Sequence, residues 1–378
     1  MLYEVHMLKN YPPTNLNRDD TGAPKTCVFG GVTRGRVSSQ CLKRSWRTSE
    51  LFQQEIGEEN LGVRTRKLPQ LVGDKLLEMG VSQEYVDEII PKLTGFGTKD
   101  GKESKKGELT AQVILFAPQD IAACADMLKK KLDACKTVKE VKALKGAELQ
   151  SAVEGASERA VTLDIALFGR MVTSNAFRDV EASMQVAHAI STNKATVESD
   201  YFTAMDDLLR GESEEEKGAA MIGDIDYNAS CYYIYASLDT DKLKENLKYT
   251  ENAEEIMEKV IPALLRVMAF SNPSGKQNSF AGHVLPSAVL VECKKSKIPT
   301  TMANAFVKPA RAENGRDLLE NSIQKLSDEA DAMARNYALP VEKRVWFCVD
   351  KYAVRPKIDT VCCQTFPQLG DEVAQTLR

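Results

Sequence analysis

Cations crowd into residues 15–47, where the sequence is NLNRDDTGAPKTCVFGGVTRGRVSSQCLKRSWR. They are Arg18, Lys25, Arg34, Arg36, Lys43, Arg44 and Arg47. Only Asp19 and Asp20 offset them, although the whole chain has a formal net charge of −4. Guanidinium and ammonium groups at this density are typical of a surface that binds a polyanion. A solvated basic loop is the alternative interpretation.

The same window contains features that suit phosphate oxygens. Gly30, Gly31 and Gly35 allow close approach of the backbone to a ligand. Ser38 or Ser39 can cap a helix over residues 40–56, and a helix start presents unpaired N–H groups to an anion. The glycine spacing matches neither mononucleotide-binding motif. Arginine and lysine side chains around that helix start would complete an anion site, which fits a phosphate and fits a row of phosphates better than one.

A second basic cluster lies in the sequence KKKLDACKTVKEVKALK. It consists of Lys129, Lys130, Lys131, Lys136, Lys139, Lys142 and Lys145. Steps of three place Lys136, Lys139 and Lys142 on one drifting stripe of a predicted helix. Such a stripe is usually a solvated helix face, and a sequence-independent polyanion contact is the sharper alternative.

Metal chemistry has weaker support in the sequence. Asp19 and Asp20 could bind Mg²⁺ beside the basic loop and make a nuclease, although paired acids next to arginines more often form salt bridges. Nine cysteines are scattered without a Cys-x-x-Cys pair, and three histidines stand in no metal-ligand spacing. We expect reduced thiols, no structural metal and no cofactor. Tyr201 and Phe202 could stack on bases or form a small satellite core.

The elements that must position these residues indicate an α+β fold. Predicted strands cover 1–9, 159–174, 183–191, 230–238, 284–293 and 343–350. Predicted helices cover 40–56, 68–79, 82–93, 119–134, 137–156, 252–269 and 316–336. Loops are predicted from residue 10 to about 37, over 97–108 and over 271–282. Residues 192–228 have weak periodicity between two strands, and such long excursions are usually functional or disordered.

Composition places the chain among globular proteins. It has 378 residues, 43% of them hydrophobic and 28% charged. The sequence pI near 5.7 argues against nonspecific nucleic-acid binding by the whole surface. The N-terminus lacks a signal-peptide pattern, and the longest apolar runs are about five residues, short of the ~20 that span a bilayer. We expect a cytoplasmic protein with no membrane partner.

Several stretches, in order along the chain, resemble the CasC family, the backbone subunit of the type I-E CRISPR surveillance complex called Cascade. They span residues 1 to about 310, and in combination they are far more specific than any one alone. They are NLNRDD with the following Lys25, FGG, RVSSQCLKRSWR, DIALFGRM, AHAIST, DYFTAMDDL and TMANAF.

The resemblance implies a fold like a right hand. Its palm is a modified RNA-recognition-motif (ferredoxin-like) domain with a helical fingers insertion and a thumb loop or hairpin. The expected boundaries are 1–57, 159–191 and 229–378 for the palm, 58–158 for the fingers and 192–228 for the thumb.

The resemblance also implies the site residues. Guide-RNA contacts are expected at Arg18, Lys25, Ser38, Gln40, Lys43, Arg44 and Arg47. Met171 matches a methionine that wedges beside the kinked RNA, and Tyr201, Phe202 and Thr203 match the thumb tip. Target DNA is expected at the finger lysines Lys136, Lys139, Lys142 and Lys145.

The implied function is a non-catalytic scaffold that stacks in several copies along the CRISPR guide RNA. Its partners are the guide RNA, target DNA, other copies of itself and other Cascade subunits. Phosphate contacts without base reading fit this role, because every guide differs in sequence. The alternative is a metal-dependent ribonuclease using Asp19 and Asp20, since related type III backbone subunits cut RNA through a loop aspartate.

Overall fold

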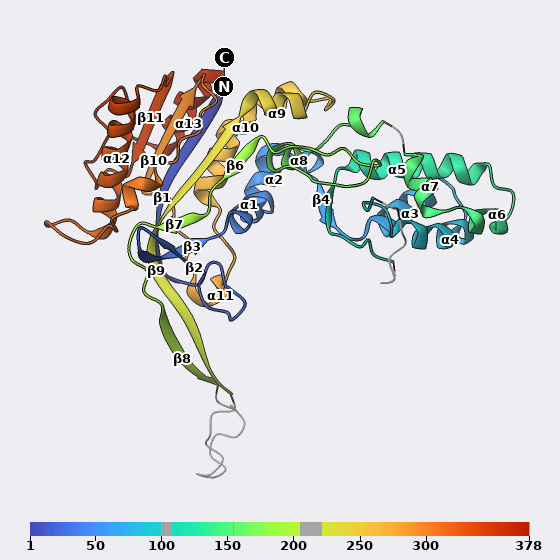
Figure 1. Cartoon of the computed structure of the whole chain (residues 1–378), viewed down its shortest axis with the longest axis horizontal. Helices are drawn as coiled ribbons and strands as arrows, with labels where there is room; N and C mark the ends of the chain where they lie inside the picture. The colour runs from blue at the N-terminus through green and yellow to red at the C-terminus, as the bar shows by residue number, and fades with distance from the viewer. Residues whose placement is uncertain (100, 102–107, 154, 205–220, 378) are drawn as a thin grey trace, which may run out of the picture. The chain divides into compact units, whose positions relative to one another are not determined.

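The computed structural model describes residues 1–99, 101, 108–153, 155–204 and 221–377 (Figure 1). The chain divides into two compact units. We call them the sheet unit, which comprises Met1–Phe52, Val186–Ser237 and Ile261–Arg378, and the helical unit, which comprises Gln53–Gln185 and Leu238–Val260. The combination of many helices with a large mixed sheet confirms the predicted α+β class.

The sheet unit is built on one sheet with the strand order β12-β11-β10-β1-β9-β7-β3-β2, and β8 pairs with the outer part of β9 (Figure 1). Its strands are β1 (Leu2–Thr14), β2 (Thr26–Phe29), β3 (Val32–Val37), β7 (Ala189–Ser191), β8 (Glu198–Ala204), β9 (Met221–Asp239), β10 (Ala288–Lys294), β11 (Lys343–Cys348) and β12 (Val361–Cys363). Its helices are α1 (Ser39–Arg47), α11 (Gln277–Phe280), η3 (Ala303–Phe306), α12 (Leu318–Tyr337), α13 (Phe366–Ala374) and η4 (Gln375–Leu377).

The central strand β1 is covered on both faces, because every residue from 2 to 9 is buried. One face packs against α12 through a core that includes Leu8, Trp346 and Ile323. The buried carboxylate of Glu4 is paired: it forms an ion pair with Lys294 and accepts a hydrogen bond from the Tyr235 hydroxyl. Paired charges make this burial tolerable, and the strand holds the rest of the sheet in register.

The helical unit has its own hydrophobic core. Leu68, Ile89 and Leu128, from three different helices, are fully buried in it, as is Phe116 from a two-stranded sheet. The elements are η1 (Glu58–Asn60), β4 (Val63–Thr65), α3 (Leu68–Glu78), α4 (Gln83–Leu93), β5 (Ile114–Phe116), α5 (Pro118–Asp133), α6 (Val138–Ala143), α7 (Gly146–Ser151), η2 (Ala156–Glu158), α8 (Leu163–Phe168) and α9 (Thr240–Asn246).

Four elements cross the boundaries between the units along the chain: α2 (Glu50–Ile56), β6 (Met184–Val186), α10 (Ala253–Phe270) and β9, whose last two residues belong to the helical unit. Among the described residues, no helix is both long enough and apolar enough to cross a membrane. Most predicted elements are confirmed with shifted ends, including those that became β1, α3, α4, α5, α10, α12 and β11. The predicted strand 284–293 begins only at Ala288, and Pro286 just before it cannot donate to a sheet ladder.

The loop predicted for residues 10–37 is wrong, because it contains the end of β1 and the hairpin of β2 and β3. Gly30 and Gly31 form the two-residue turn with φ of 61° and 72°, as a type I′ hairpin turn requires. A Cβ on Gly30 would lie 2.3 Å from the Val307 carbonyl oxygen, and one on Gly35 would lie 2.5 Å from the Tyr232 hydroxyl. These glycines therefore admit other parts of the chain, and their predicted role of admitting a ligand is unsupported.

The strand predicted over 159–174 is also wrong, because the segment forms α8. Its residues Leu163 to Leu167 are buried on every side, and alternation then cannot distinguish a strand from a helix. Asp164 fixes the start of the helix by accepting hydrogen bonds from the Thr162 hydroxyl (2.7 Å) and the Ile165 N–H (3.0 Å). Gly169, with a φ of 80°, follows the last turn.

Two predicted helices are broken in the structure. The helix over 40–56 ends at Arg47, because the Thr48 and Ser49 hydroxyls bond the carbonyls of the last turn (2.8 Å each), and α2 then begins. The helix over 137–156 divides into α6 and α7. The buried ammonium of Lys92 donates to the Lys142 and Leu144 carbonyls at 2.8 and 2.6 Å, which satisfies the end of α6.

The predicted strand 183–191 is present as two short strands, β6 and β7. The excursion over 192–228 forms the paired strands β8 and β9 in its described part, and residues 205–220 lie outside the described residues. Most of the charged loop predicted over 97–108 lies outside them as well. The hairpin expected for the thumb is thus present in its two arms.

Candidate nucleic-acid interface

The loop that carries Arg18 and Lys25 is held by asparagine side chains. The Asn15 amide donates to the carbonyls of Gly22 (2.9 Å) and Asp226 (2.8 Å). The Lys25 N–H donates to the Asn17 carbonyl at 2.8 Å, and the Asn17 side chain accepts from the Ser38 N–H at 2.9 Å. The loop is therefore fixed to the start of α1, and it presents Arg18 as an exposed cation and Lys25 as a half-buried one.

Asp19 closes a turn in this loop. One of its carboxylate oxygens, Oδ1, accepts hydrogen bonds from the Thr21 hydroxyl (2.7 Å), the Thr21 N–H (2.9 Å) and the Ala23 N–H (3.1 Å). The bond from the Thr21 hydroxyl is the main reason why the pKa of Asp19 is below its ordinary value. Asp20 is exposed beside it. Within the described part of the chain, no three His, Cys, Asp or Glu side chains gather as a metal site would require.

Helix α1 begins as the sequence predicts. Ser38 caps it by accepting the Cys41 N–H at 3.3 Å, and its side chain is buried at the helix start. Gln40, Arg44 and Arg47 follow helical spacing and share one face, on which Gln40 and Arg44 are exposed. Lys43 is half-buried, and burial lowers its pKa. The N–H groups of the first turn and these cations together suit an anion.

Two titrating side chains show which cations gather around the start of α1. Burial raises the pKa of Cys41, and the nearby positive charges of Lys25 and Arg44 oppose that rise. Burial also lowers the pKa of His188, and the charges of Arg36 and Lys25 lower it further. The three cations Lys25, Arg36 and Arg44, with the His188 imidazole beside them, are called the α1 cation cluster below.

Arg36 and His188 are members of this cluster that are absent from the guide-RNA contacts implied by the resemblance. The Arg36 guanidinium Nη1 lies 3.1 Å from His188 Nδ1, and its Nε donates to the Thr26 carbonyl at 3.2 Å. Arg36 belongs to the basic window of the sequence, so its charge alone was a signal. His188 lies 152 residues further along the chain, and only the pairing of β3 with β7 brings it there.

Arg34, two residues from Arg36, has a different role. Its side chain is fully buried, and its two Nη atoms donate to the carbonyls of Ser191, Thr192, Phe306 and Val307 at 2.6–3.1 Å. This fork attaches the segment TMANAF to the edge of β3 and β7. Arg34 is therefore a structural residue, although it stands in the basic window.

Met171 is the most exposed of the large hydrophobic residues in the described chain, at 90%. It follows Arg170, whose buried guanidinium pairs with Asp120 and donates to the Arg178 carbonyl at 2.8 and 3.0 Å. A buried ionic contact therefore holds an apolar side chain in solvent. A single exposed apolar side chain is ordinary on a protein surface, and its position is compatible with the expected wedge against a nucleic acid.

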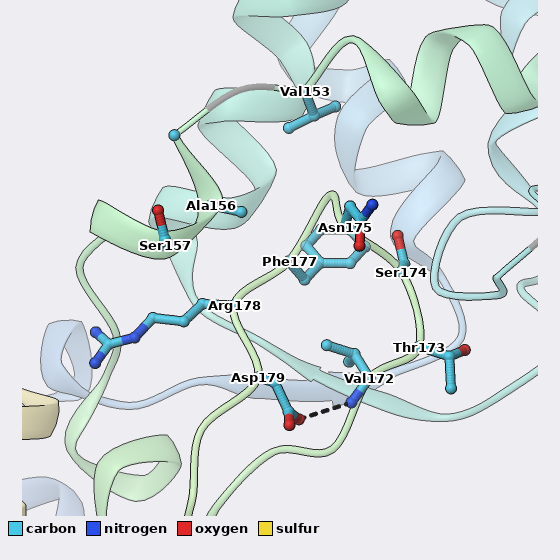
Figure 2. A pocket seen from close by; sticks show the side chains of 11 residues that line it. Val153, Ala156, Ser157, Val172, Thr173, Ser174, Asn175, Phe177, Arg178 and Asp179 are labelled. Carbon is cyan, nitrogen blue, oxygen red and sulfur yellow. Dashed lines mark hydrogen bonds between the residues drawn. The ribbon is translucent and has the colours of Figure 1, made fainter.

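A pocket of about 550 Å³ lies in the same loop of the helical unit (Figure 2). Residues 172–175 and 177–179 form one wall, and Val153, Ala156 and Ser157 contribute to the other. Figure 2 shows the hydrogen bond of 3.1 Å between the Val172 N–H and the Asp179 carboxylate, which closes the loop. None of the predicted site residues lines this pocket.

The thumb residues lie on the hairpin of β8 and β9. Tyr201 is 65% exposed, and Thr203 is exposed beside Ile222. Phe202 is half-buried, because its ring covers Gly223 on the opposite strand, where a Cβ would lie 2.6 Å from the ring. Tyr201 is thus the aromatic side chain of this pair that is presented to solvent.

The described arms of the hairpin are acidic. Residues 195–204 and 221–230 contain no lysine or arginine, and their charged residues are Glu198, Asp200, Asp224 and Asp226. Carboxylates repel phosphates, so these arms cannot hold a nucleic-acid backbone by charge. Contact through the Tyr201 ring is compatible with them.

The finger lysines are all exposed, but they do not form one helical stripe. Lys136 precedes α6, Lys139 and Lys142 lie on it, and Lys145 precedes α7. Lys142 pairs with Glu88 at 3.0 Å, and Lys145 lies 3.8 Å from Glu148. The predicted stripe is therefore wrong in geometry, while the four lysines remain on the surface of neighbouring segments.

Comparison with known proteins relates this arrangement to CRISPR proteins. A family model described as CT1975-like protein, a Cas family, matches residues 3–371. No curated protein sequence matches the chain. A solved chain described as "CRISPR RNA-guided surveillance complex, pre-nicking" is similar with a TM-score of 0.81 and 25% identity, and both chains are covered fully.

A second solved chain, described as "CRISPR RNA-guided surveillance complex", has a TM-score of 0.69 and 23% identity, again with both chains fully covered. This likeness concerns the fold alone. The family model, in contrast, matches nearly the whole sequence. The chain therefore belongs to the Cas protein family described as CT1975-like.

Proposed function

We propose that this chain is the backbone subunit of a type I-E CRISPR surveillance complex, and that it binds the guide RNA without cutting it. The observation that carries the proposal is the α1 cation cluster beside the start of a capped helix. Such groups hold phosphates and make no use of base edges. A subunit that must accept every guide needs this kind of contact.

The family and the similar solved chains support the same function. In this proposal the sheet unit acts as an RNA-recognition-motif-like palm, and the helical unit supplies the fingers. The hairpin of β8 and β9 is the thumb, which displaces a base at regular intervals. Several copies line up along one RNA, and other subunits of the complex bind this filament in the cytoplasm.

Two exposed apolar side chains are proposed as further RNA contacts, Tyr201 on the sheet unit and Met171 on the helical unit. Met171 wedges beside the RNA where it is kinked, and Tyr201 stacks at the thumb. Both are large, exposed and carried by rigid local structure. Stacking and wedging are independent of sequence, since every base has an apolar face.

The finger lysines are proposed to contact target DNA. Lys136, Lys139, Lys142 and Lys145 are exposed on a unit separate from the α1 cation cluster. Each adds little in one subunit, because exposed lysines contribute weakly and are screened by salt. Repetition along a filament multiplies that contribution.

The absence of cutting is part of the proposal, and the ribonuclease alternative depends on Asp19 and Asp20. The Asp19 carboxylate is committed to three hydrogen bonds within its turn, which supports a structural role. Phosphoryl transfer with two metal ions would need further carboxylates converging on the same point.

The test uses the whole chain and an end-labelled guide RNA with Mg²⁺. We expect the RNA to stay intact and to be protected from an added ribonuclease in a repeating pattern. RNA cut by the chain itself would contradict the proposal. If Asp20→Asn abolished that cutting while Asp371→Asn, an exposed control, did not, the ribonuclease alternative would be established.

A further inference from the structure

His188 occupies a defined place in the proposed RNA site. In the pairing of β3 with β7, Arg36 lies opposite Ile190 and Val37 lies opposite Ala189. His188 directly precedes Ala189 and Ser38, which caps α1, directly follows Val37, so both residues lie at the same end of this pairing. The exposed imidazole of His188 is therefore at the end of the strand pair from which α1 begins.

The contact with Arg36 determines which nitrogen of His188 carries the proton. A guanidinium N–H can only donate, so Nδ1, at 3.1 Å from Arg36 Nη1, must accept. The imidazole is then neutral, and its proton lies on Nε2. The Nε2–H group remains available as a hydrogen-bond donor, and the contact between Nδ1 and Arg36 fixes the orientation of the ring.

Burial and the surrounding charges both favour the neutral form of His188 in the absence of RNA. The charged groups that act on it within the described chain are Arg36, from β3, and Lys25, from the segment before β2. Both are positive, and both add to the effect of burial in lowering the pKa of the imidazole. A phosphate bound among Arg36, Lys25 and His188 would instead raise the pKa of the imidazole, because a neighbouring anion favours its charged form.

We propose that His188 and Arg36 form a proton-coupled contact for a backbone phosphate of the guide RNA. In the free chain Arg36 donates to His188 Nδ1. When a phosphate binds, the imidazole takes a proton from solvent at Nδ1, and both nitrogens become donors. Nδ1–H can no longer accept from Arg36, so the guanidinium turns its donor to the phosphate as well. This inference rests on the proposed function of the chain.

The direction of the pH effect follows from linkage. RNA binding raises the pKa of His188. At pH values between the His188 pKa of the free chain and that of the complex, the complex therefore holds more protons than the free chain. The affinity for RNA must then rise as pH falls through this window. Above the His188 pKa of the complex, the affinity must not change with pH. If His188 only supported Arg36 structurally, the affinity for RNA would not show this dependence on pH.

The experiment measures the affinity of the whole chain for one guide RNA from pH 5.5 to 8.5 at constant ionic strength. Between pH 8 and pH 6 we expect affinity to increase on the order of five- to tenfold, since one titrating group changes affinity by at most tenfold per pH unit. The variant His188→Gln keeps a neutral donor but cannot take up a proton. It should bind about twofold more weakly at pH 8 and show less than about a twofold change with pH.

The matched control is His283→Gln, an exposed histidine of the same unit that lies outside the α1 cation cluster. This variant should keep the full pH dependence. Calorimetry in two buffers of different ionisation enthalpy should show proton uptake by the unmodified chain at pH 6.5, and none by His188→Gln.

The outcomes separate this inference from the proposed function. RNA binding that is independent of pH, or a slope that survives in His188→Gln, would overturn the inference alone. Failure of the unmodified chain to bind guide RNA at any pH would overturn the proposed function and this inference together.

Discussion

Lys43 and Arg44 are adjacent on α1, and the proposal places both against RNA phosphates. The double change Lys43→Ala with Arg44→Ala should weaken guide-RNA binding equally for every guide sequence, because phosphate contacts carry no sequence information. Each lost contact should also reduce the slope of log affinity against log salt by about 0.7 for a single strand. Binding to several guides across a salt series measures both effects.

The control for this experiment removes the same charge elsewhere. Lys244→Ala with Lys259→Ala changes two exposed lysines outside the proposed site. Affinity and salt slope should stay close to those of the unmodified chain. If this control weakened binding as much as the α1 change, the interaction would be general attraction to the chain, and the α1 site would be ruled out.

Arg34 and Arg36 stand two residues apart, yet their substitution should change the free energy of unfolding by different amounts. Arg34→Met would remove the donor of four carbonyls, three of them in buried hydrogen bonds, and should lower the free energy of unfolding by about 2–4 kcal/mol. Arg36→Met should cost about 0.5 kcal/mol or less. Denaturant unfolding of both variants tests this contrast, and equal losses would contradict the assigned roles.

For single residues, the sequence predicted which segment carries the positive charge, but not which charged side chains face a ligand and which hold the fold together. Lys25 and Arg44 were predicted as neighbours in a basic window, and both lie near Cys41. Arg34 could not be distinguished from Arg36, because the carbonyls that it binds come from segments 157 to 273 residues away. His188 was omitted for the same reason, since strand pairing and not local sequence places it.

The hairpin of β8 and β9 should bind RNA by stacking, given its acidic arms. Tyr201→Ala should weaken filament assembly on RNA by about 1–3 kcal/mol, the usual range for one base stacked on an aromatic ring. The salt slope should not change, because no charge is lost. Tyr337→Ala is the control, since Tyr337 is also 65% exposed and lies on α12. A changed salt slope in Tyr201→Ala would show that the hairpin contacts phosphates.

The α6 segment should affect DNA and leave RNA binding unchanged. The triple change Lys136→Ala, Lys139→Ala and Lys142→Ala should preserve guide-RNA assembly and slow association with target duplex, most strongly at low salt. Association rates and RNA footprints of the same preparation provide the two readouts. Loss of guide RNA in this variant would mean that the two basic clusters have been assigned the wrong way round.

Among the elements, those with one clear apolar face were predictable and those buried all round were not. The amphipathic helix α12 was located within two residues at its start. The fully buried α8 was mistaken for a strand, because burial on every side removes the periodic signal. The break between α6 and α7 depends on Lys92, which comes from a separate helix and is invisible in local sequence.

At the scale of the whole molecule, the two units place the two proposed surfaces on separate parts of the chain. The α1 cation cluster belongs to the sheet unit, and the lysines near α6 belong to the helical unit. This division suits the proposed scaffold, which would hold the guide RNA permanently and contact the target DNA briefly. The mixed α+β class was predictable from the order of elements, whereas the division into units depends on contacts distant in sequence.

The central claim is that copies of this chain assemble along a guide RNA whatever its sequence. Native mass spectrometry of the chain co-expressed with a CRISPR array, repeated with a second array of unrelated spacers, tests it most directly. We expect particles that contain several copies of the chain on one intact RNA, with the same copy number for both arrays. Chain that is monomeric and free of RNA with both arrays would contradict the claim.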